Sequence, residues 1–356
     1  MPLRDYLWTR NAARSGAPSA VDDDRIGPGA PYDPRTRRFH NPPGSPKKPK
    51  DEKAWRAFVK RRMSDREVPV VPADHALSLH ETLAGIRAHE GRDCVTWIGH
   101  ACFLLRISGV TILLDPYLSK VAGPRPGIGP RRYVPAALDA TQLPPIDILA
   151  VSHNHYDHLD LKAIRALPHK DRIAAVTTLG LGAYFRNRGY DDVRELDWGQ
   201  RTRRDGVTIT AVPAVHFSKR TPFDRNRTLW AGFAIEGGGK RVYFAGDSAY
   251  GPVFAEWGER LGGFDLGLVG IGAYAPRALM VATHTSPEDA VQLGRDLGCR
   301  ALMGMHWGAI KLTDEPVFEP PKRFRDAGKA GGYATEDLWI MKIGETREIP
   351  SRRGEN

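Results

Sequence analysis

Residues 146–160 read IDILAVSHNHYDHLD, and this stretch decides the interpretation of the whole chain. The apolar run IDILAV is typical of a buried strand, and the polar segment after it places three imidazoles and a carboxylate within six positions: His153, His155, Asp157 and His158. Packed neutral imidazoles at this density are hard to satisfy with hydrogen bonds, whereas Zn²⁺ readily accepts imidazole nitrogens and carboxylate oxygens. In a tight turn, His153 and His155 can point to one side and Asp157 with His158 to the other. One loop is therefore expected to serve two metal ions.

Three further candidate ligands each end an apolar run downstream. His216 closes VTITAVPAVH, Asp247 closes RVYFAGD, and His306 closes ALMGMH. Any one of them alone would be interpreted as a capping or surface residue. Together with the histidine-rich loop they predict ligands that converge from the ends of separate strands at one edge of a sheet.

The pattern of strand-like and helix-like segments from about residue 90 onward predicts a layered αβ architecture. Short β-branched and aromatic runs such as CVTWI, CFLLRI, VTILLD, RIAAVTT, WAGFAIE and DLGLVG are typical of strands. Helical spacing occurs in LDLKAIRAL, LGAYFRNRG and SPEDAVQLGRDLG, and the last of these opens with Ser286 as the expected N-cap. We therefore expect strands and helices to alternate, with antiparallel strands at the start.

The charge and composition exclude several classes of protein. The chain has 356 residues and a formal net charge of +10, but residues 1–66 hold sixteen Lys or Arg against eight Asp or Glu, which leaves the rest of the chain near neutrality. A near-neutral body disfavours nucleic-acid binding, including a nuclease. No run approaches the roughly 18 apolar residues of a membrane-spanning helix, and the start lacks a long apolar signal region. The three cysteines show no paired spacing, so we expect buried, reduced thiols and a cytoplasmic location.

Three segments are expected along the chain: a basic, Pro- and Arg-rich arm over residues 1–66, a connecting segment over 67–92, and a catalytic domain over 93–349. Within the arm, KAWRAFVKRRM over 53–63 has the spacing of a short amphipathic helix. Its apolar stripe consists of Trp55, Phe58, Val59 and Met63. This stripe either docks on the core of the domain or contacts an anionic membrane surface as a peripheral anchor.

Long phrases of this sequence resemble the N-acyl-phosphatidylethanolamine-hydrolysing phospholipase D family of metallo-β-lactamase-fold hydrolases. They are VTWIGHA, LPPIDILAVSHNHYDHLD, ELDWG, FAGDS, IGAYAPR, SPEDAV and MHWGAIKLTDEPVFEPP, with a looser match at RFHNP in the arm. The resemblance covers residues 93–349. It implies an α+β fold, the αββα sandwich, with a dinuclear zinc site between two sheets, and iron or manganese as alternative metals.

The resemblance also implies a role for each candidate ligand. It assigns His153, His155 and His216 to the first metal, Asp157, His158 and His306 to the second, and Asp247 to a position bridging both. Hydrolysis of a phospholipid phosphodiester by a metal-activated hydroxide would follow, with Asp157 as the expected general base. His284 matches a family position near the substrate, which implies substrate binding or protonation of the leaving group.

Other histidines and other functions remain as alternatives. His100 and Asp115 are expected to support the ligands rather than to act on substrate, and His40, His75, His80, His89 and His169 are expected at the surface. A lactonase or a sugar-phosphate lactone hydrolase of the same fold is the main alternative to a phospholipase. A lipid-binding protein without catalysis fits poorly, because it has no need of seven metal ligands. The expected partners are a phospholipid and a membrane surface, with a homodimer as an alternative to a monomer.

Overall fold

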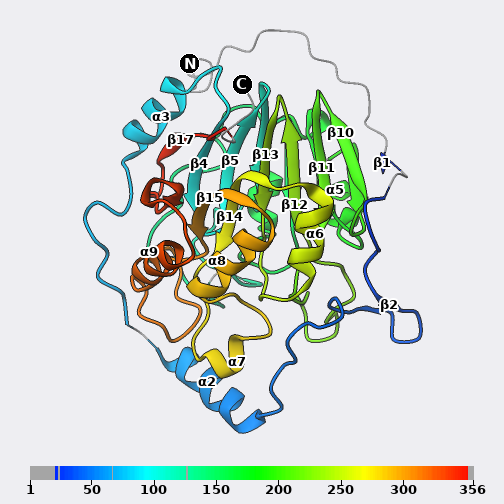
Figure 1. The fold of residues 1–356 in the computed structure, drawn as a ribbon, viewed down its shortest axis with the longest axis vertical. Coiled ribbons are helices and arrows are strands. Elements are labelled where there is room, and N and C mark those ends of the chain that lie inside the picture. Colours follow the sequence, from blue (N-terminus) through cyan, green and yellow to red (C-terminus); the bar gives the residue numbers. More distant parts are fainter. Residues whose placement is uncertain (1–20, 23–24, 66, 126, 352–356) are drawn as a thin grey trace.

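The structure is a computed structural model that describes residues 21–22, 25–65, 67–125 and 127–351. Two β-sheets lie face to face, and helices cover the outer face of each (Figure 1). Among the described residues, no helix is long and apolar enough to cross a membrane. Cys94, Cys102 and Cys299 are all buried, as predicted.

The first sheet has eight strands and mixed directions. Its spatial order is β1 (Val21–Asp22), β10 (Arg201–Arg204), β11 (Val207–Val212), β12 (Gly232–Gly237), β13 (Lys240–Phe244), β14 (Phe264–Gly270), β15 (Cys299–Met305) and β16 (Leu338–Trp339). The strands from β10 to β13 pair antiparallel, and those from β13 to β16 pair parallel. Strands β11, β13, β14 and β15 therefore all end at the same edge of this sheet.

The second sheet has seven strands. Its order is β17 (Thr346–Glu348), β4 (Cys94–Gly99), β5 (Cys102–Ile107), β6 (Val110–Leu114), β7 (Ile148–Val151), β8 (Ala174–Thr178) and β9 (Asp192–Leu196). The antiparallel meander predicted at the start is present as β4, β5 and β6, and β6 to β9 pair parallel. Parallel pairing brings the ends of β6 and β7 to one edge, where the histidine-rich loop begins.

The alternation of side chains along β5 explains why the sheets pack as two inner layers. Phe103, Leu105 and Ile107 point into the core between the sheets, where the Phe103 ring lies 6.3 Å from that of Phe244. Cys102 and Leu104 point the other way, into a second apolar cluster beneath the helices. A strand buried on both faces reads as a continuous apolar run, as CFLLRI does.

The helices form the outer layers of the fold. α6 (Val253–Leu261), α8 (Pro287–Asp296) and α9 (Pro320–Ala330) lie over the first sheet, and α3 (Leu79–Ala88), α4 (Leu161–Ala166) and α5 (Gly182–Arg186) lie beside the second (Figure 1). Ser286 caps α8 with Asp289 in a capping box, as the sequence predicted for that N-terminus. Neither α6 nor α9 was predicted from the sequence.

The described part of the N-terminal arm packs on the body. Strand β1 pairs with β10, the hairpin of β2 (Tyr32–Asp33) and β3 (Arg38–Phe39) buries Phe39, and α2 (Glu52–Ser64) confirms the helix predicted over 53–63. Phe58 of α2 is buried against Leu279 and Met280 of α7 (Arg277–Met280). Trp55 is 37% exposed, so the predicted stripe is divided between the core and the surface.

Candidate metal centre

The predicted ligands meet at the edge where the two sheets present the ends of their strands. The second sheet contributes the loop after β7, and the first sheet contributes Asp247 after β13, His306 after β15 and His216 beyond the end of β11. Every one of these strands runs toward this edge. The polar residues that follow these separate apolar strands therefore lie close together in one buried site.

One group consists of His153, His155, His216 and Asp247, whose ligand atoms all lie within 4.8 Å of one another. Nδ1 of His155 is 2.9 Å from Nε2 of His153 and 3.2 Å from Nε2 of His216. Oδ2 of Asp247 is 3.8 Å and 3.6 Å from the same two Nε2 atoms. This is the set that the resemblance assigned to the first metal, together with the bridging carboxylate.

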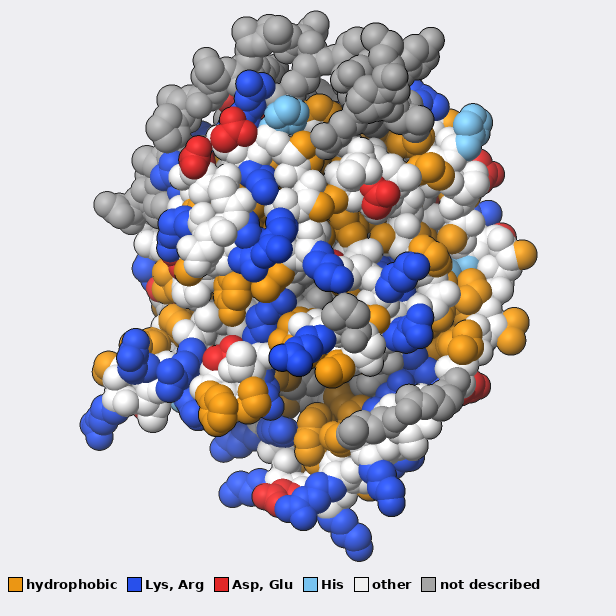
Figure 2. Space-filling view, turned by 180° about the vertical axis from the view of Figure 1, so that it is seen from behind, with side chains coloured by type: hydrophobic (Ala, Val, Ile, Leu, Met, Phe, Trp, Pro, Cys, Tyr) orange, Lys and Arg blue, Asp and Glu red, His pale blue; other side chains and the backbone are white. Residues whose placement is uncertain are grey.

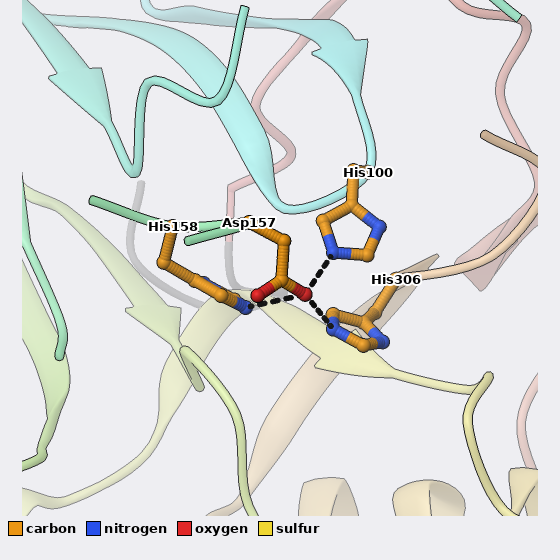
Figure 3. Close-up of side chains that lie close together, drawn as sticks. All are labelled: His100, Asp157, His158 and His306. Atoms are coloured by element: carbon orange, nitrogen blue, oxygen red, sulfur yellow. Dashed lines mark hydrogen bonds and ion pairs between the residues drawn. The ribbon is translucent and has the colours of Figure 1, made fainter. Parts of the chain in front are cut away.

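A second group consists of His100, Asp157, His158 and His306 (Figure 3). Oδ2 of Asp157 lies 3.0 Å from Nε2 of His100, 3.6 Å from Nε2 of His306 and 3.8 Å from Nε2 of His158. Three of the four residues are those assigned to the second metal. The fourth, His100, was expected only in a supporting position, and its Nε2 faces Asp157 directly.

Asp247 lies between the two groups. Its Oδ2 is 3.1 Å from Nε2 of His158, and its Oδ1 is 3.1 Å from Nε2 of His306. The same carboxylate therefore faces ring nitrogens of both groups. This is the position that a bridging ligand requires.

Hydrogen bonds on the far side of three rings fix which nitrogen points inward. Asp115 accepts from Nδ1 of His158 at 2.6 Å, and the carbonyl of Thr283 accepts from Nδ1 of His216 at 2.8 Å. The Ser152 hydroxyl donates to Asp115 at 2.5 Å, so its oxygen accepts from Nδ1 of His153 at 2.9 Å. Each ring therefore turns its Nε2 toward the centre, which is how metal-binding histidines are held.

The donor set fits metal ions. The lone pairs of two Nε2 atoms, from His153 and His216, point at the single Nδ1 of His155, which can carry at most one proton. Nε2 of His158 and Nε2 of His306 are buried, and each faces an oxygen of Asp247 at 3.1 Å without forming a well-directed hydrogen bond. A cation resolves both problems, because it accepts several lone pairs at once.

The electrostatics of the cluster favour positive charge. Burial lowers the pKa of His306, but Asp247 and Asp157 outweigh it and raise that pKa to about 9. Burial raises the pKa of Asp247, yet the facing His158 and His306 hold it well below its usual range. The carboxylates thus stay ionised and create a potential that attracts cations.

Asp115 and His284 lie next to the ligands. Asp115 is fully buried and supports Ser152 and His158, as expected. His284 lies 5.2 Å from the His216 ring and 5.3 Å from the His306 ring, so it borders both groups. Burial lowers its pKa to about 4.

The prediction that His75 is a surface residue is wrong. His75 is 6% exposed, its Nε2 lies 2.7 Å from the Gly308 carbonyl, and the rings of Trp97, Trp307 and Phe318 surround it. The polar sequence around His75 concealed this burial, because the partners come from distant segments. His75 therefore buttresses the turn that carries His306.

Two residues that stabilise the ligand residues, Arg220 and Asn41, were not predicted from the sequence. The Arg220 guanidinium donates to the carbonyls of Asn154 and Leu159, at 2.9 Å each, and stacks 4.0 Å over the Tyr156 ring. Asn41 of the arm accepts from the His216 backbone N–H at 2.9 Å. Asn41 lies in the RFHNP phrase, which was the only available signal; nothing in the sequence marked Arg220.

A model of the Beta-lactamase superfamily domain matches residues 110–307, which contain all seven predicted ligands. The chain belongs to the beta-lactamase superfamily. A Mycobacterium tuberculosis protein of uncharacterized function is 39% identical to it over 248 residues, or 68% of this chain and 66% of that relative, so the match spans just under two thirds of the relative's length. N-acyl-phosphatidylethanolamine-hydrolyzing phospholipase D 1 of Caenorhabditis elegans is 36% identical over 77% of this chain and 78% of that relative.

Solved structures agree with this superfamily assignment at the level of the fold. Isothiocyanate hydrolase from Delia radicum gut bacteria superposes with a TM-score of 0.57 and 22% identity, over 72% of this chain and 99% of that one. The metallo-beta-lactamase fold protein YhfI of Bacillus subtilis superposes with a TM-score of 0.51 and 19% identity, over 72% and 100%. The predicted α+β metallo-β-lactamase fold is confirmed. The superfamily match therefore spans a cluster of seven His and Asp side chains that could hold metal ions.

Proposed function

We propose that this protein is a dinuclear phospholipase D-type enzyme that hydrolyses the phosphodiester of N-acyl phosphatidylethanolamine or a similar phospholipid. The observation that carries the proposal is the pair of ligand groups joined by Asp247. The Caenorhabditis elegans relative supports the choice of substrate, because its name states this activity and its match extends over most of both chains. A mitochondrial relative from Saccharomyces cerevisiae, 32% identical over 73% of this chain, carries the same activity in its name.

The residues present suit a phosphodiester. Two bound metal ions would lower the pKa of a water molecule toward neutrality and offset the charge of the phosphoryl oxygens. His153, His155 and His216 would hold one ion, Asp157, His158 and His306 the other, and Asp247 both. Zinc fits this mixture of imidazole and carboxylate, and iron or manganese would also accept it.

Two residues are proposed to act beside the ligands. Oδ2 of Asp157 accepts from Nε2 of His100 at 3.0 Å, so this carboxylate is oriented and can accept the proton of the attacking water. The ring of His284 borders both ligand groups, where it can hydrogen-bond a substrate oxygen or the leaving group. Both side chains would thus contact the reacting atoms.

We also propose that α2 brings the enzyme to a membrane surface as a peripheral contact. Phe58 is buried against α7 and Val59 packs partly beside it, whereas Trp55, Arg56 and Lys60 are exposed on the same helix along an open groove of about 590 Å³. An exposed indole beside cationic side chains is typical of interfacial contacts. Such binding would be reversible and sensitive to salt.

The test is a preparation with quantified metal, assayed against N-acyl phosphatidylethanolamine, other phospholipids and a set of lactones. We expect about two metal ions per chain and release of phosphatidic acid from the N-acyl phospholipid. Asp247→Ala serves as the matched inactive control. Turnover of lactones but of no phospholipid would overturn the proposal in favour of a lactonase, and protein without stoichiometric metal would overturn it altogether.

A further inference from the structure

We infer that Lys48, Lys219 and Arg225 form a cationic rim beside the metal centre that selects phosphodiester lipids by net charge, favouring anionic over zwitterionic headgroups. This inference rests on the proposed phosphodiesterase function and adds the residues that determine its specificity. The rim joins two segments far apart in sequence, the arm before α2 and the loop between β11 and β12.

Arg225 is tied to the ligand cluster through one aromatic ring. Its guanidinium lies 4.4 Å over the ring of Phe217, and that ring lies 4.6 Å from the ring of His155. Arg225 is therefore one aromatic layer away from the first ligand group.

Lys219 and Lys48 extend the same positive charge outward. The backbone N–H of Lys219 donates to the Asn154 side chain at 2.8 Å, which holds this residue against the ligand loop. Nζ of Lys48 lies 4.4 Å over the ring of Trp55 on α2. Burial, then Arg225, then Lys219 lower the pKa of Lys48, as expected of cations gathered in one place.

Lys48, Lys219 and Arg225 form no ion pair with the acidic side chains that the structure describes, and Lys48 and Lys219 are exposed. Asp224, in the same loop, accepts hydrogen bonds from the backbone N–H groups of Arg220 and Thr221 rather than pairing with Arg225. Figure 2 shows Lys and Arg side chains around hydrophobic ones in the lower half of one face, with few acidic side chains between them.

The chemistry of the headgroup explains what such a rim can distinguish. Phosphatidylethanolamine carries one negative phosphodiester and one positive ammonium, so its net charge is zero. Acylation of the nitrogen converts the ammonium into a neutral amide and leaves a net charge of minus one. A cationic rim attracts the phosphodiester of both lipids but repels the ammonium of phosphatidylethanolamine. It therefore favours the N-acylated lipid without any contact with the amide group.

The size of the effect follows from Coulomb's law. One rim cation about 10 Å from the ammonium of a substrate weakens the binding of that substrate roughly two-fold in water. Three rim cations together therefore give about an eight-fold preference for the substrate without the ammonium at low salt. Salt at about 1 M shortens the screening length to about 3 Å and removes most of it.

The test uses soluble substrates, so that membrane binding plays no part. Dihexanoyl phosphatidylethanolamine, its N-acetyl derivative, dihexanoyl phosphatidylcholine and dihexanoyl phosphatidylglycerol are assayed below their micelle-forming concentrations for kcat/KM. The variant Lys48→Gln/Lys219→Gln/Arg225→Gln is compared with a matched control, Arg87→Gln/Arg325→Gln/Lys329→Gln, which removes three exposed cations from α3 and α9. A second variant, Lys48→Glu/Lys219→Glu, changes exposed side chains only and leaves the Phe217 stack intact.

We expect the wild-type enzyme and the control to prefer the two anionic substrates, the Gln variant to lose about eight-fold of that preference, and the Glu variant to lose more. In about 1 M salt the wild-type preference should fall to that of the Gln variant. Unchanged preference in the Gln and Glu variants would overturn the rim while leaving the phosphodiesterase intact. So would a preference for the N-acetyl lipid without one for phosphatidylglycerol. Hydrolysis of none of the four by metal-loaded enzyme would overturn the proposed function and the rim with it.

Discussion

The ligand cluster and the docked helix α2 lie at the same end of the molecule but are held in different ways. In the cluster, His153, His158 and His216 each have one ring nitrogen fixed by a buried acceptor. Among the described side chains of α2, Phe58 is buried with Ala54 and Val59 packed beside it, and at the C-terminal end Arg61 pairs with Asp314 and Asp65 with Lys311. Buried polar networks tolerate little change, whereas surface ion pairs contribute little each. The cluster should therefore respond steeply to single substitutions, and α2 only gradually.

Replacing Asp247 should have the largest effect. Asp247→Ala removes a carboxylate that faces ring nitrogens of both ligand groups, and two cations left there would repel each other. We expect turnover to fall on the order of 10³-fold or more, the scale seen when a key electrostatic contact is lost. Elemental analysis should find fewer than two metal ions per chain. A variant that keeps both ions and near-normal turnover would refute the bridging position.

The supports behind the rings should rank next, and they can be compared with each other. Asp115→Asn weakens the acceptor of both Ser152 and His158, so metal affinity should fall about 10- to 100-fold. Ser152→Ala removes only the partner of His153 and should cost less. Competition with a chelator measures both affinities. Equal losses in the two variants would contradict the idea that Asp115 orders two ligands at once.

A pair of substitutions on α2 tests the weaker of the two regions. Phe58→Ala empties a small apolar cluster with Leu279 and Met280, and we expect a loss of about 2 kcal/mol in the free energy of unfolding, below the roughly 3–5 kcal/mol of a main core. Trp55→Ala should leave stability nearly unchanged and instead reduce binding to anionic vesicles. Denaturant unfolding and vesicle sedimentation separate the two. If Trp55→Ala destabilises the protein as much as Phe58→Ala, the whole stripe serves core packing and the membrane contact is refuted.

The smallest effect is expected from Asp65, at the C-terminal end of α2. A hydrogen bond from Lys311, 2.9 Å away, holds the pKa of Asp65 at about 2, below its ordinary 3.8. Because the folded-state pKa is depressed, the stabilisation is complete above pH 4 and is lost as the pH falls from about 4 to about 2. The side chain is partly exposed, so the contribution should stay below about 1 kcal/mol.

Asp65→Asn provides the reference for this last measurement. The difference in unfolding free energy between wild type and Asp65→Asn should be constant from pH 7 to about 4, shrink below that, and diminish with added salt. A difference that grows as the pH falls would mean that Asp65 is not stabilised by its cationic neighbours.

The sequence by itself determined the candidate ligands of the metal centre and much of the fold. A strand and a candidate metal-binding loop are predicted by the segment IDILAVSHNHYDHLD alone. This is possible because the density of potential ligands and the apolar periodicity depend only on residues that are neighbours in the chain. The apolar runs ending in His216, Asp247 and His306 could be predicted as strand ends for the same reason. The resemblance to known phrases then supplied the grouping of the seven ligands, which spacing alone left open.

Only the tertiary structure decided which distant groups support that chemistry. His75 appeared to be a surface residue because its sequence neighbours are polar, yet Trp97, Trp307 and Phe318 bury it. Arg220 stabilises the ligand loop by donating to two backbone carbonyls. Because every residue has a backbone carbonyl, such contacts cannot be predicted from residue types. Burial, ring orientation and the gathering of cations at a rim all depend on contacts between segments far apart along the chain, and such contacts exist only once the two sheets have packed.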